Sequence, residues 1–328
     1  MLLEELCVKR LRFSKEAIGR LCDMLKDDLQ TCSKSRIALS VSMEVTMALD
    51  FFASGSFQSG TGDISDMSQC AARSCINQVS EFIDFDLSTW QQKETALAGF
   101  PKVIGTVDGT HVALKALIEA PARYINRKWY HSLNVMIVCD AQLRILSVNA
   151  DHSNLYDALN ELPAGSAWIL NDKGYPLKPW LMTPYRRTNN EAQERCNQAL
   201  VGTRQVVERT IGLLKSCFWC LDRSGGTLQY SPVKVSRTVV AYCALYNFAL
   251  QEGLTVNPAD QLPAEMEETE DPNVPLVRRD RVEPTGAKSR AAREQRVANT
   301  FRGDDAVASI PPPRLPQQGT EKNTRNLK

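Results

Sequence analysis

The sequence changes character at Val103-Ile-Gly-Thr-Val-Asp-Gly-Thr-His111, where a strand-forming run follows about a hundred residues of helical pattern. Residues 103–107 form the first β-rich run, and residues 133–139, 143–148 and 168–170 form three more. Helical patterns follow at about 191–217 and 233–251. Strands first, and then strand and helix in alternation, predict an α/β fold with a mixed sheet flanked by helices.

The first 95 residues read as a helical region. Apolar residues recur there at helical spacing in three places: Phe13, Ala17, Leu21 and Leu25; Val41, Val45 and Leu49; and Ala72, Cys75, Ile76 and Val79. Ser14 suits the N-cap of the first of these helices, and the Gly- and Ser-rich residues 55–60 interrupt the pattern. Helix, turn and helix in this order fit a DNA-binding module or a small bundle that only packs, and both interpretations stay open.

The chain becomes polar and Pro-rich after Gly253. An acidic cluster at 265–271 and three prolines at 311–313 predict a mostly disordered tail, with residues 288–301 as a basic, isolated helix. We therefore divide the chain into a helical, helix-turn-helix-like region (1–95), a catalytic domain (96–253) and a tail (254–328).

Composition excludes several classes of protein. A hydrophobic share of 43% argues against disorder throughout, and the sequence has no apolar run long enough for a transmembrane helix. Glu4 and Glu5 stand where a signal peptide would be basic and then apolar, so we expect an intracellular protein with no membrane association. We expect its ten cysteines to be reduced thiols, because they are widely spaced in a chain without a secretion signal.

Three acids stand out by position. Asp108 follows the strand predicted at 103–107, Asp172 follows the strand at 168–170, and Glu208 lies within a helical pattern. Ligands of α/β proteins usually bind outside the carboxyl edge of the sheet, where the first two acids belong. Mg²⁺ prefers oxygen ligands, and two such ions can activate water and stabilise the leaving oxygen of a phosphodiester. These positions fit a metal site, and an ordinary surface helix with a solvated charged face is the alternative interpretation of Glu208.

The helix around Glu208 has two different faces. On a wheel of about 100° per residue, Arg204, Gly212 and Lys215 lie near Glu208. Val207, Ile211, Leu214 and Phe218 form a separate apolar stripe. Residues 172–237 contain eleven Lys and Arg against five Asp and Glu, a net charge of +6 in a chain of net charge +1. A basic rim of this kind suits a polyanion, and a solvated basic surface is the alternative.

Seven short motifs occur in the order seen in Harbinger-type DDE transposases. Among them are Val107-Asp-Gly-Thr-His-Val112, Tyr130-His-Ser-Leu-Asn-Val135, Asp172-Lys-Gly-Tyr-Pro-Leu177 and Val207-Glu-Arg-Thr-Ile-Gly212; the others are at 138–140, 180–184 and 228–232. The chain resembles this family and its domesticated, nuclease-like members over residues 9–253, most closely over 103–250. Each motif is weakly specific, but seven in register are strongly so.

The resemblance implies an RNase H-like fold with an acidic triad at Asp108, Asp172 and Glu208, the last two 36 residues apart. It adds Asp157 as a further metal ligand. The implied activity is hydrolysis of DNA phosphodiester bonds with Mg²⁺ or Mn²⁺, in the nucleus and cytoplasm. A separate Myb-like DNA-binding protein is the implied partner. We assign phosphate contacts to Arg204, Arg209 and Lys215.

The sequence also departs from the family pattern. Lys173 replaces a serine beside Asp172, and the link from Asp157 to Asp172 is only 15 residues, shorter than the family pattern. Leu200 and Tyr246 stand where the family has histidines. The alternative function is therefore a catalytically silent DNA-binding or scaffold protein that retains the transposase fold. A purely structural interaction protein would require a neutral surface around Glu208.

Other signals have simpler explanations. Thr106 stands where an aspartyl phosphatase would need its nucleophile, which argues against that class of enzyme. Cys217 and Cys220 have metal-clip spacing without a second pair, so we expect ordinary thiols. We expect His111 to make a structural hydrogen bond and Asp140 to occupy a turn between two strands.

Overall fold

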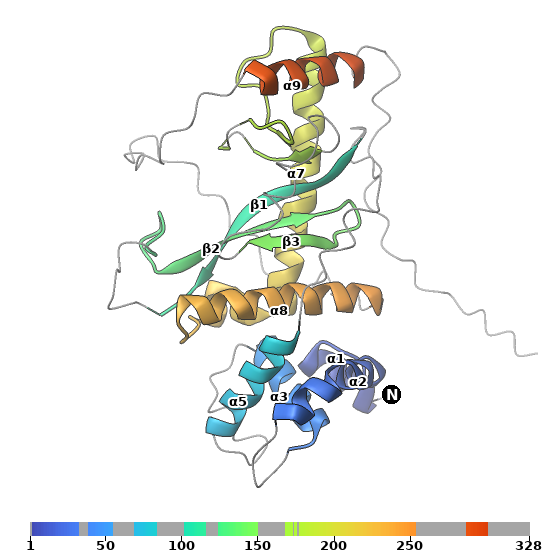
Figure 1. The fold of residues 1–328 in the computed structure, drawn as a ribbon, viewed down its shortest axis with the longest axis vertical. Coiled ribbons are helices and arrows are strands. Elements are labelled where there is room, and N and C mark those ends of the chain that lie inside the picture. Colours follow the sequence, from blue (N-terminus) through green and yellow to red (C-terminus); the bar gives the residue numbers. More distant parts are fainter. Residues whose placement is uncertain are drawn as a thin grey trace, which may run out of the picture.

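A mixed sheet lies at the centre of the molecule (Figure 1). The computed structural model describes residues 2–32, 39–54, 69–83, 102–115, 124–149, 168–172, 174–175, 177–253 and 287–300. Within these residues the sheet has five strands: β1 (Val103–Ala113), β2 (Ser132–Cys139), β3 (Ile145–Asn149), β4 (Trp168–Leu170) and β5 (Leu181–Met182). Their order is β3-β2-β1-β4-β5. The first three strands along the chain pair antiparallel, whereas β4 runs parallel to both β1 and β5. This sheet, flanked by helices, is consistent with the predicted RNase H-like α/β fold.

The strand β1 is longer than the sequence pattern predicts. We expected it to end at Val107, but it continues to Ala113 because residues Thr106 to Ala113 pair with β2 without a break. Asp108 therefore lies inside the strand rather than after it. Asp108 and Gly109 are poor strand formers, so the local pattern missed residues that cross-strand pairing keeps extended.

The turn between β2 and β3 is built as predicted. Asp140 is buried, and its Oδ1 accepts hydrogen bonds from the backbone N–H groups of Gln142 and Arg144, each at 2.9 Å.

By contrast, the sequence did not predict the strand β5. It has only two residues, and its pairing with β4 rather than its own sequence defines it.

Two long helices pack against the sheet at the predicted places. α7 (Glu191–Cys217) begins at the N-cap Asn190, whose side chain accepts a hydrogen bond from Gln193 N at 2.9 Å. α8 (Pro232–Gln251) packs against β2 and β3. Part of its contact is polar, since Asn247 Oδ1 accepts from the backbone N–H of Ile145 at 2.9 Å. No helix in the described part of the chain has the length and apolar character needed to cross a bilayer.

The N-terminal region is helical, as predicted. It contains α1 (Leu2–Leu11), α2 (Lys15–Cys32), α3 (Val41–Ser54) and α5 (Gln69–Phe82). Ser14 caps α2, with its Oγ accepting from Ala17 N at 3.1 Å, and the predicted apolar positions of α2 are buried. Residues 55–60 lie outside the described residues, so the helix-turn-helix interpretation stays a prediction.

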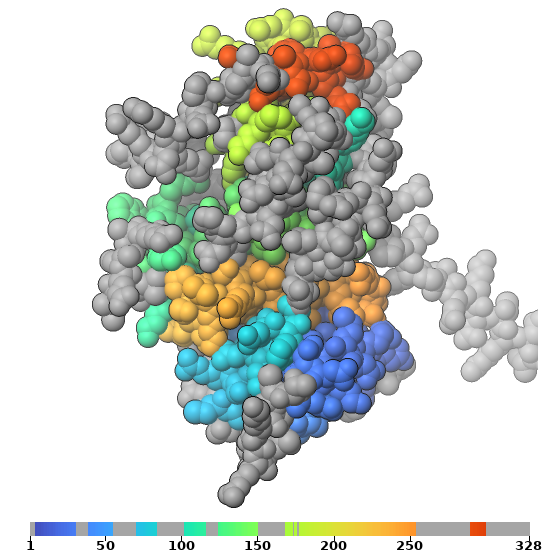
Figure 2. All heavy atoms as spheres, in the orientation of Figure 1, coloured from blue at the N-terminus to red at the C-terminus, as the bar shows by residue number. Residues whose placement is uncertain are grey.

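These N-terminal helices share one hydrophobic core with the sheet and α8. Figure 2 shows the blue and cyan helices packed directly against the orange α8. The ring centroids of Phe52 and Tyr242 are 4.8 Å apart, and those of Phe13 and Phe248 are 5.9 Å apart. Aromatic pairs of this kind join the N-terminal helices to the domain that contains the sheet and α8. We therefore expect these two regions to unfold together. The boundary proposed at residue 95 stays a prediction.

The basic helix near the C-terminus is α9 (Ala287–Thr300), and it is not isolated. Val297 is buried in a cluster with Trp168 and Cys196, which joins α9 to β4 and α7. The Arg293 guanidinium lies 3.8 Å from the centroid of the Tyr185 ring. Arginine stems bury well against aromatic rings, so a helix with few apolar residues still packs here. The other residues of the proposed tail lie outside the described residues.

The shared core leads to a first prediction. Phe52→Ala removes a fully buried ring and should lower the free energy of unfolding by about 3–5 kcal/mol. Trp168 and Trp180 report on the sheet, whereas α1, α2, α3 and α5 contain no tryptophan. The midpoint of unfolding in Phe52→Ala should therefore shift by the same amount whether unfolding is followed by tryptophan fluorescence or by circular dichroism. Met24→Ala, at a side chain that is 66% exposed, should change stability by less than about 0.5 kcal/mol. Two separate transitions would contradict the shared core.

Candidate functional site

Asp108 lies in β1, and Asp172 lies two residues beyond the end of the neighbouring parallel strand β4. Thr106 of β1 is paired with Leu170 of β4, and each acid comes two residues after its member of this pair. Thr106 Oγ1 also donates to the Leu170 carbonyl at 3.3 Å. A step of two residues along a strand returns to the same face, and adjacent strands are about 4.8 Å apart. The register thus brings the two acids from distant parts of the sequence to one edge of the sheet.

Backbone hydrogen bonds orient both carboxylates. Asp108 Oδ1 accepts from Gly109 N at 2.7 Å, and Asp172 Oδ1 accepts from Gly174 N at 2.8 Å. The side chain of Asn171 in turn accepts from Asp172 N at 2.7 Å. One such bond uses only one of about four lone-pair sites of a carboxylate. These bonds set the direction of the carboxylates without saturating them.

α7 carries the third acid above this edge. Val207, Thr210 and Leu214 of α7 are buried, and the helix contacts β1 and β2. Thr210 Oγ1 approaches Cys139 Sγ of β2 at 3.4 Å. Glu208 lies on a different side of the helix, where its side chain is 45% exposed. The two faces predicted from the helical wheel are therefore confirmed.

A cavity of about 290 Å³ lies between α7 and the sheet. It is lined by Thr106, Val107, Leu170, Asn171, Asp172, Pro184, Leu200, Val201, Thr203 and Arg204. Asn171 Nδ2 is buried there without a hydrogen-bond partner, so it offers a donor to a ligand or water. Asn171 was missed in the sequence, although its position directly before Asp172 was a signal. Leu200, at the position of a family histidine, is part of the apolar wall.

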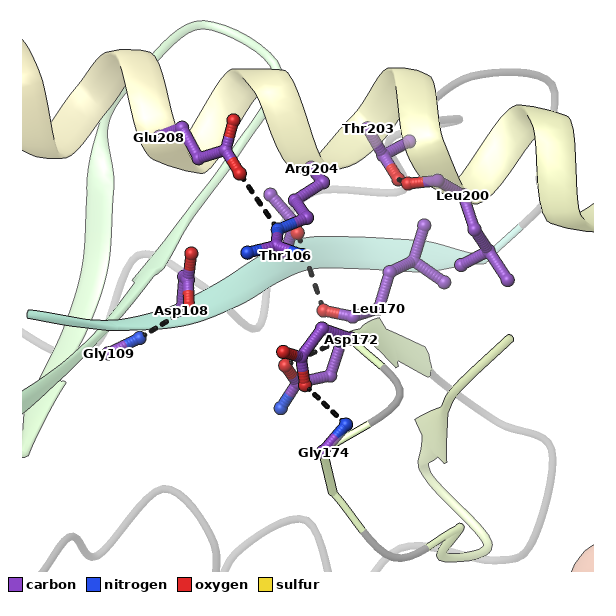
Figure 3. Close-up of polar contacts among 11 residues, drawn as sticks. Thr106, Asp108, Gly109, Leu170, Asp172, Gly174, Leu200, Thr203, Arg204 and Glu208 are labelled. Atoms are coloured by element: carbon purple, nitrogen blue, oxygen red, sulfur yellow. Dashed lines mark hydrogen bonds and ion pairs between the residues drawn. The ribbon is translucent and has the colours of Figure 1, made fainter. Parts of the chain in front are cut away.

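Arg204 pairs with one of the three acids and lines the cavity beside another. Its Nε lies 2.8 Å from Glu208 Oε1, one turn along α7, and the guanidinium also lines the cavity that contains Asp172. Figure 3 shows it extending from α7 toward the sheet, over Thr106. Both side chains of the pair are more than 40% exposed, so the pair contributes only about 0.2–1 kcal/mol. It can therefore open at little cost.

The donor atoms suit a hard divalent cation, because all three acids offer carboxylate oxygens. Within the described residues, no group of three His, Cys, Asp or Glu side chains stands close enough to hold a metal ion. Glu208 faces Arg204 in this conformation. Convergence of the three acids on a metal thus stays a prediction, and it requires Glu208 to leave Arg204. Asp157 and Lys173 lie outside the described residues.

The other predicted phosphate contacts lie apart from the cavity. Lys215 Nζ is 3.8 Å from Asp222 Oδ2, at the far end of α7. Arg209 lies near the Tyr246 hydroxyl: burial raises the pKa of this phenol, and the charge of Arg209 opposes that rise. Neither cation lines the cavity with Arg204. Tyr246, at the position of the second family histidine, is a buried core residue.

The remaining candidates have structural roles. His111 Nδ1 lies 3.0 Å from Ser132 Oγ, which agrees with the predicted structural hydrogen bond. Cys217 and Cys220 are buried, and burial raises the pKa of each thiol to about 12. Cys220 Sγ is 2.7 Å from the Tyr242 hydroxyl, so it belongs to the core.

Comparison with known proteins identifies the family of the chain. The family model for the DDE superfamily endonuclease matches residues 107–247, a range that includes Asp108, Asp172 and Glu208. The protein named Putative nuclease HARBI1 is 34% identical to the chain in both Bos taurus and Homo sapiens; each match covers 80% of the chain and 84% of the relative. Antagonist of Like Heterochromatin Protein 1 from Arabidopsis thaliana is 21% identical over 74% of the chain and 72% of its own length. No solved structure matches the chain significantly.

The exposure of the acids leads to a second prediction. Glu208→Gln changes a side chain that is 45% exposed and whose ion pair with Arg204 is also exposed, so the free energy of unfolding should fall by less than about 1 kcal/mol. Val207→Ala, one residue earlier on the buried face, should cost about 1.5–3 kcal/mol through lost burial and a cavity. Urea denaturation of the two variants measures the difference. Equal destabilisation by both would show that Glu208 is part of the packing.

Proposed function

Because this chain belongs to the DDE superfamily of endonucleases, together with the HARBI1 nucleases, we propose that it hydrolyses DNA phosphodiester bonds with the help of Mg²⁺ or Mn²⁺. The observation that supports the proposal is the register of β1 and β4, because Asp108 and Asp172 each come two residues after the paired Thr106 and Leu170. Glu208 on α7 completes a set of three carboxylates from three separate elements.

In the proposed site, Asp108 and Asp172 hold the metal from the sheet and Glu208 holds it from α7, with Asp157 as a weaker fourth ligand. A bound divalent metal supplies Lewis-acid polarisation of the phosphate and an activated water. Arg204 leaves Glu208 and binds a phosphate oxygen, for which its planar guanidinium is well suited. The Asn171 amide donates a second hydrogen bond to the phosphate, and Leu200 and Pro184 form the apolar part of the cavity wall.

DNA is the partner that this chemistry requires. A separate Myb-like protein that supplies sequence recognition stays part of the proposal, as does a location in the nucleus and cytoplasm. Arg209 and Lys215 stay proposed phosphate contacts on the outer parts of α7.

A catalytically silent DNA-binding protein is the second candidate. The specific observation in its favour is the ion pair between Arg204 and Glu208, because a guanidinium there competes with a metal ion for the same carboxylate. The two candidates differ in one outcome, hydrolysis, which the next experiment measures.

The third prediction concerns nicking of supercoiled DNA by purified protein with Mn²⁺ or Mg²⁺. Asp108→Asn, Asp172→Asn and Glu208→Gln should each lower the rate by more than about 100-fold, since each removes a metal ligand. Glu191→Gln is the matched control, because Glu191 is a 75% exposed acid on the same helix that also pairs with an arginine. Its rate should be unchanged. Folded wild type that binds DNA but never nicks it would favour the silent candidate.

The fourth prediction concerns metal affinity. If Arg204 competes with the metal for Glu208, Arg204→Gln should tighten Mn²⁺ binding about two- to fivefold, the worth of one exposed ion pair. The same variant should bind DNA more weakly, because it loses a phosphate contact. Arg195→Gln, which removes an i,i+4 pair with Glu191 on the same helix, should change neither affinity. Titration of Mn²⁺ by calorimetry decides the question. Unchanged or weaker Mn²⁺ binding by Arg204→Gln would rule out the competition.

A further inference from the structure

The loop that joins β1 to β2 presents a tryptophan to solvent. Trp129 is 87% exposed, the largest exposed fraction among the exposed large hydrophobic side chains of the described residues. Exposing an indole of this size forgoes a large gain from burial. An isolated exposed apolar residue is common, but this one is also held in an unusual conformation.

Trp129 has a φ of 58°, in the left-handed region that bulky residues rarely adopt. Asn126 holds the backbone in this shape: its Oδ1 accepts from Lys128 N at 2.9 Å and from Tyr130 N at 3.3 Å. Its Nδ2 donates to Ser132 Oγ at 2.9 Å. The backbone N–H of Trp129 donates to the Asn126 carbonyl at 3.1 Å. The loop is thus a braced turn that fixes the indole outward, and strain of this kind is often found where a residue acts.

The charges around the indole are positive. Arg127 and Lys128 directly precede Trp129 and are exposed, and residues 124–132 contain no acid. The Arg223 guanidinium stacks 4.4 Å from the centroid of the neighbouring Tyr130 ring, which joins a second segment of the chain to the loop. An exposed aromatic ring with flanking cations is the chemistry that binds unpaired nucleotides, with a base on the ring and phosphates on the cations. A protein partner would not require this charge, so nucleic acid fits better.

The loop is connected to the strand that carries Asp108. It follows the carboxyl end of β1, and the backbone N–H of Leu114 pairs with the His131 carbonyl at 3.0 Å (Figure 1). Leu114 is six residues beyond Asp108, which is about 20 Å along an extended strand. At about 3.4 Å per nucleotide, that length corresponds to about six nucleotides of one DNA strand.

We propose that residues 126–130 form a second DNA contact, in which Trp129 stacks on an unpaired base while Arg127 and Lys128 hold the adjacent phosphates. The contact rests on the proposed function for its substrate, DNA, but not on hydrolysis. Since the loop lies beyond the end of β1, the unpaired nucleotides would lie several positions away from the phosphate at the acids. The enzyme would thereby prefer distorted or partly opened DNA to a perfect duplex.

The test measures binding of the full chain to labelled DNA without divalent metal, so catalysis plays no part. The two probes are a paired duplex and the same duplex with a short single-stranded gap. Trp129→Ala should weaken binding to the gapped probe about 5- to 150-fold, and binding to the paired duplex much less. Trp129→Phe should keep most of the affinity, because it keeps a stacking ring. Met24→Ala, a distant exposed side chain, is the control and should bind like wild type.

Two further readouts separate stacking from a change in structure. The gapped probe should quench the tryptophan fluorescence of wild type, and this quenching should be absent from Trp129→Phe, which lacks the stacking indole. Thermal unfolding of Trp129→Ala should match that of wild type because the Trp129 ring is exposed. Arg127→Ala and Lys128→Ala should each lower the salt dependence of binding by about one phosphate contact.

The outcomes distinguish this inference from the proposed function. Nicking by wild type together with unchanged gapped-probe binding by Trp129→Ala would overturn the second contact and leave the nuclease in place. Trp129-dependent binding without nicking would support the contact and remove hydrolysis. Wild type that binds neither probe would overturn both.

Discussion

The site depends on the parallel pairing of β1 with β4. Only residues 103–106 of β1 pair with residues 168–170 of β4. Their register nevertheless relates Asp108 to Asp172, although the two acids are 64 residues apart in the sequence. Because the side chains of a strand alternate between faces, a shift of one residue would turn one acid to the opposite face. Trp168 and Leu170 of β4 are buried in a cluster with α7 and α9, and Ile169 between them is buried in a second cluster with Val107 and Val138, so packing on both faces holds this register. The geometry of the proposed site is a consequence of how a three-residue strand is packed.

Three carboxylates around one site repel one another unless a cation lies among them. In the protein alone, Arg204 supplies that charge by pairing with Glu208, and its guanidinium reaches the cavity that Asp172 lines. The pair is exposed and weak, so a divalent cation with two charges can replace it. In the proposed complex with metal and DNA, Arg204 would then bind a phosphate of the DNA in place of Glu208. In the proposed mechanism one residue thus balances the charge of Glu208 and binds the substrate, so a basic side chain beside the proposed metal ligands is compatible with hydrolysis.

The sequence predicted the elements better than their contacts. The bounds of α7 and the burial of Val207 beside an exposed Glu208 follow from helical periodicity, which is a local property. The two-residue β5 and the continuation of β1 through Asp108 depend on neighbouring strands, so no local pattern contained them. The docking of α9 was missed for a related reason, since its contacts are arginine stems on aromatic rings rather than an apolar stripe. The order of motifs did identify the family, because it carries information about the whole fold.

The charge count of the sequence needs the structure to be interpreted. The net charge of +6 over residues 172–237 suggested a basic rim around the acids, but Lys215 pairs with Asp222 and Arg209 faces Tyr246. Only Arg204 of the three predicted phosphate contacts reaches the cavity. Binding a long polyanion takes several cations along its path, and one guanidinium is too few. Further positive charge must come from outside α7. The braced loop with Arg127 and Lys128 belongs to the connection beyond the carboxyl end of β1, the strand that carries Asp108, so a DNA strand that follows β1 would meet both.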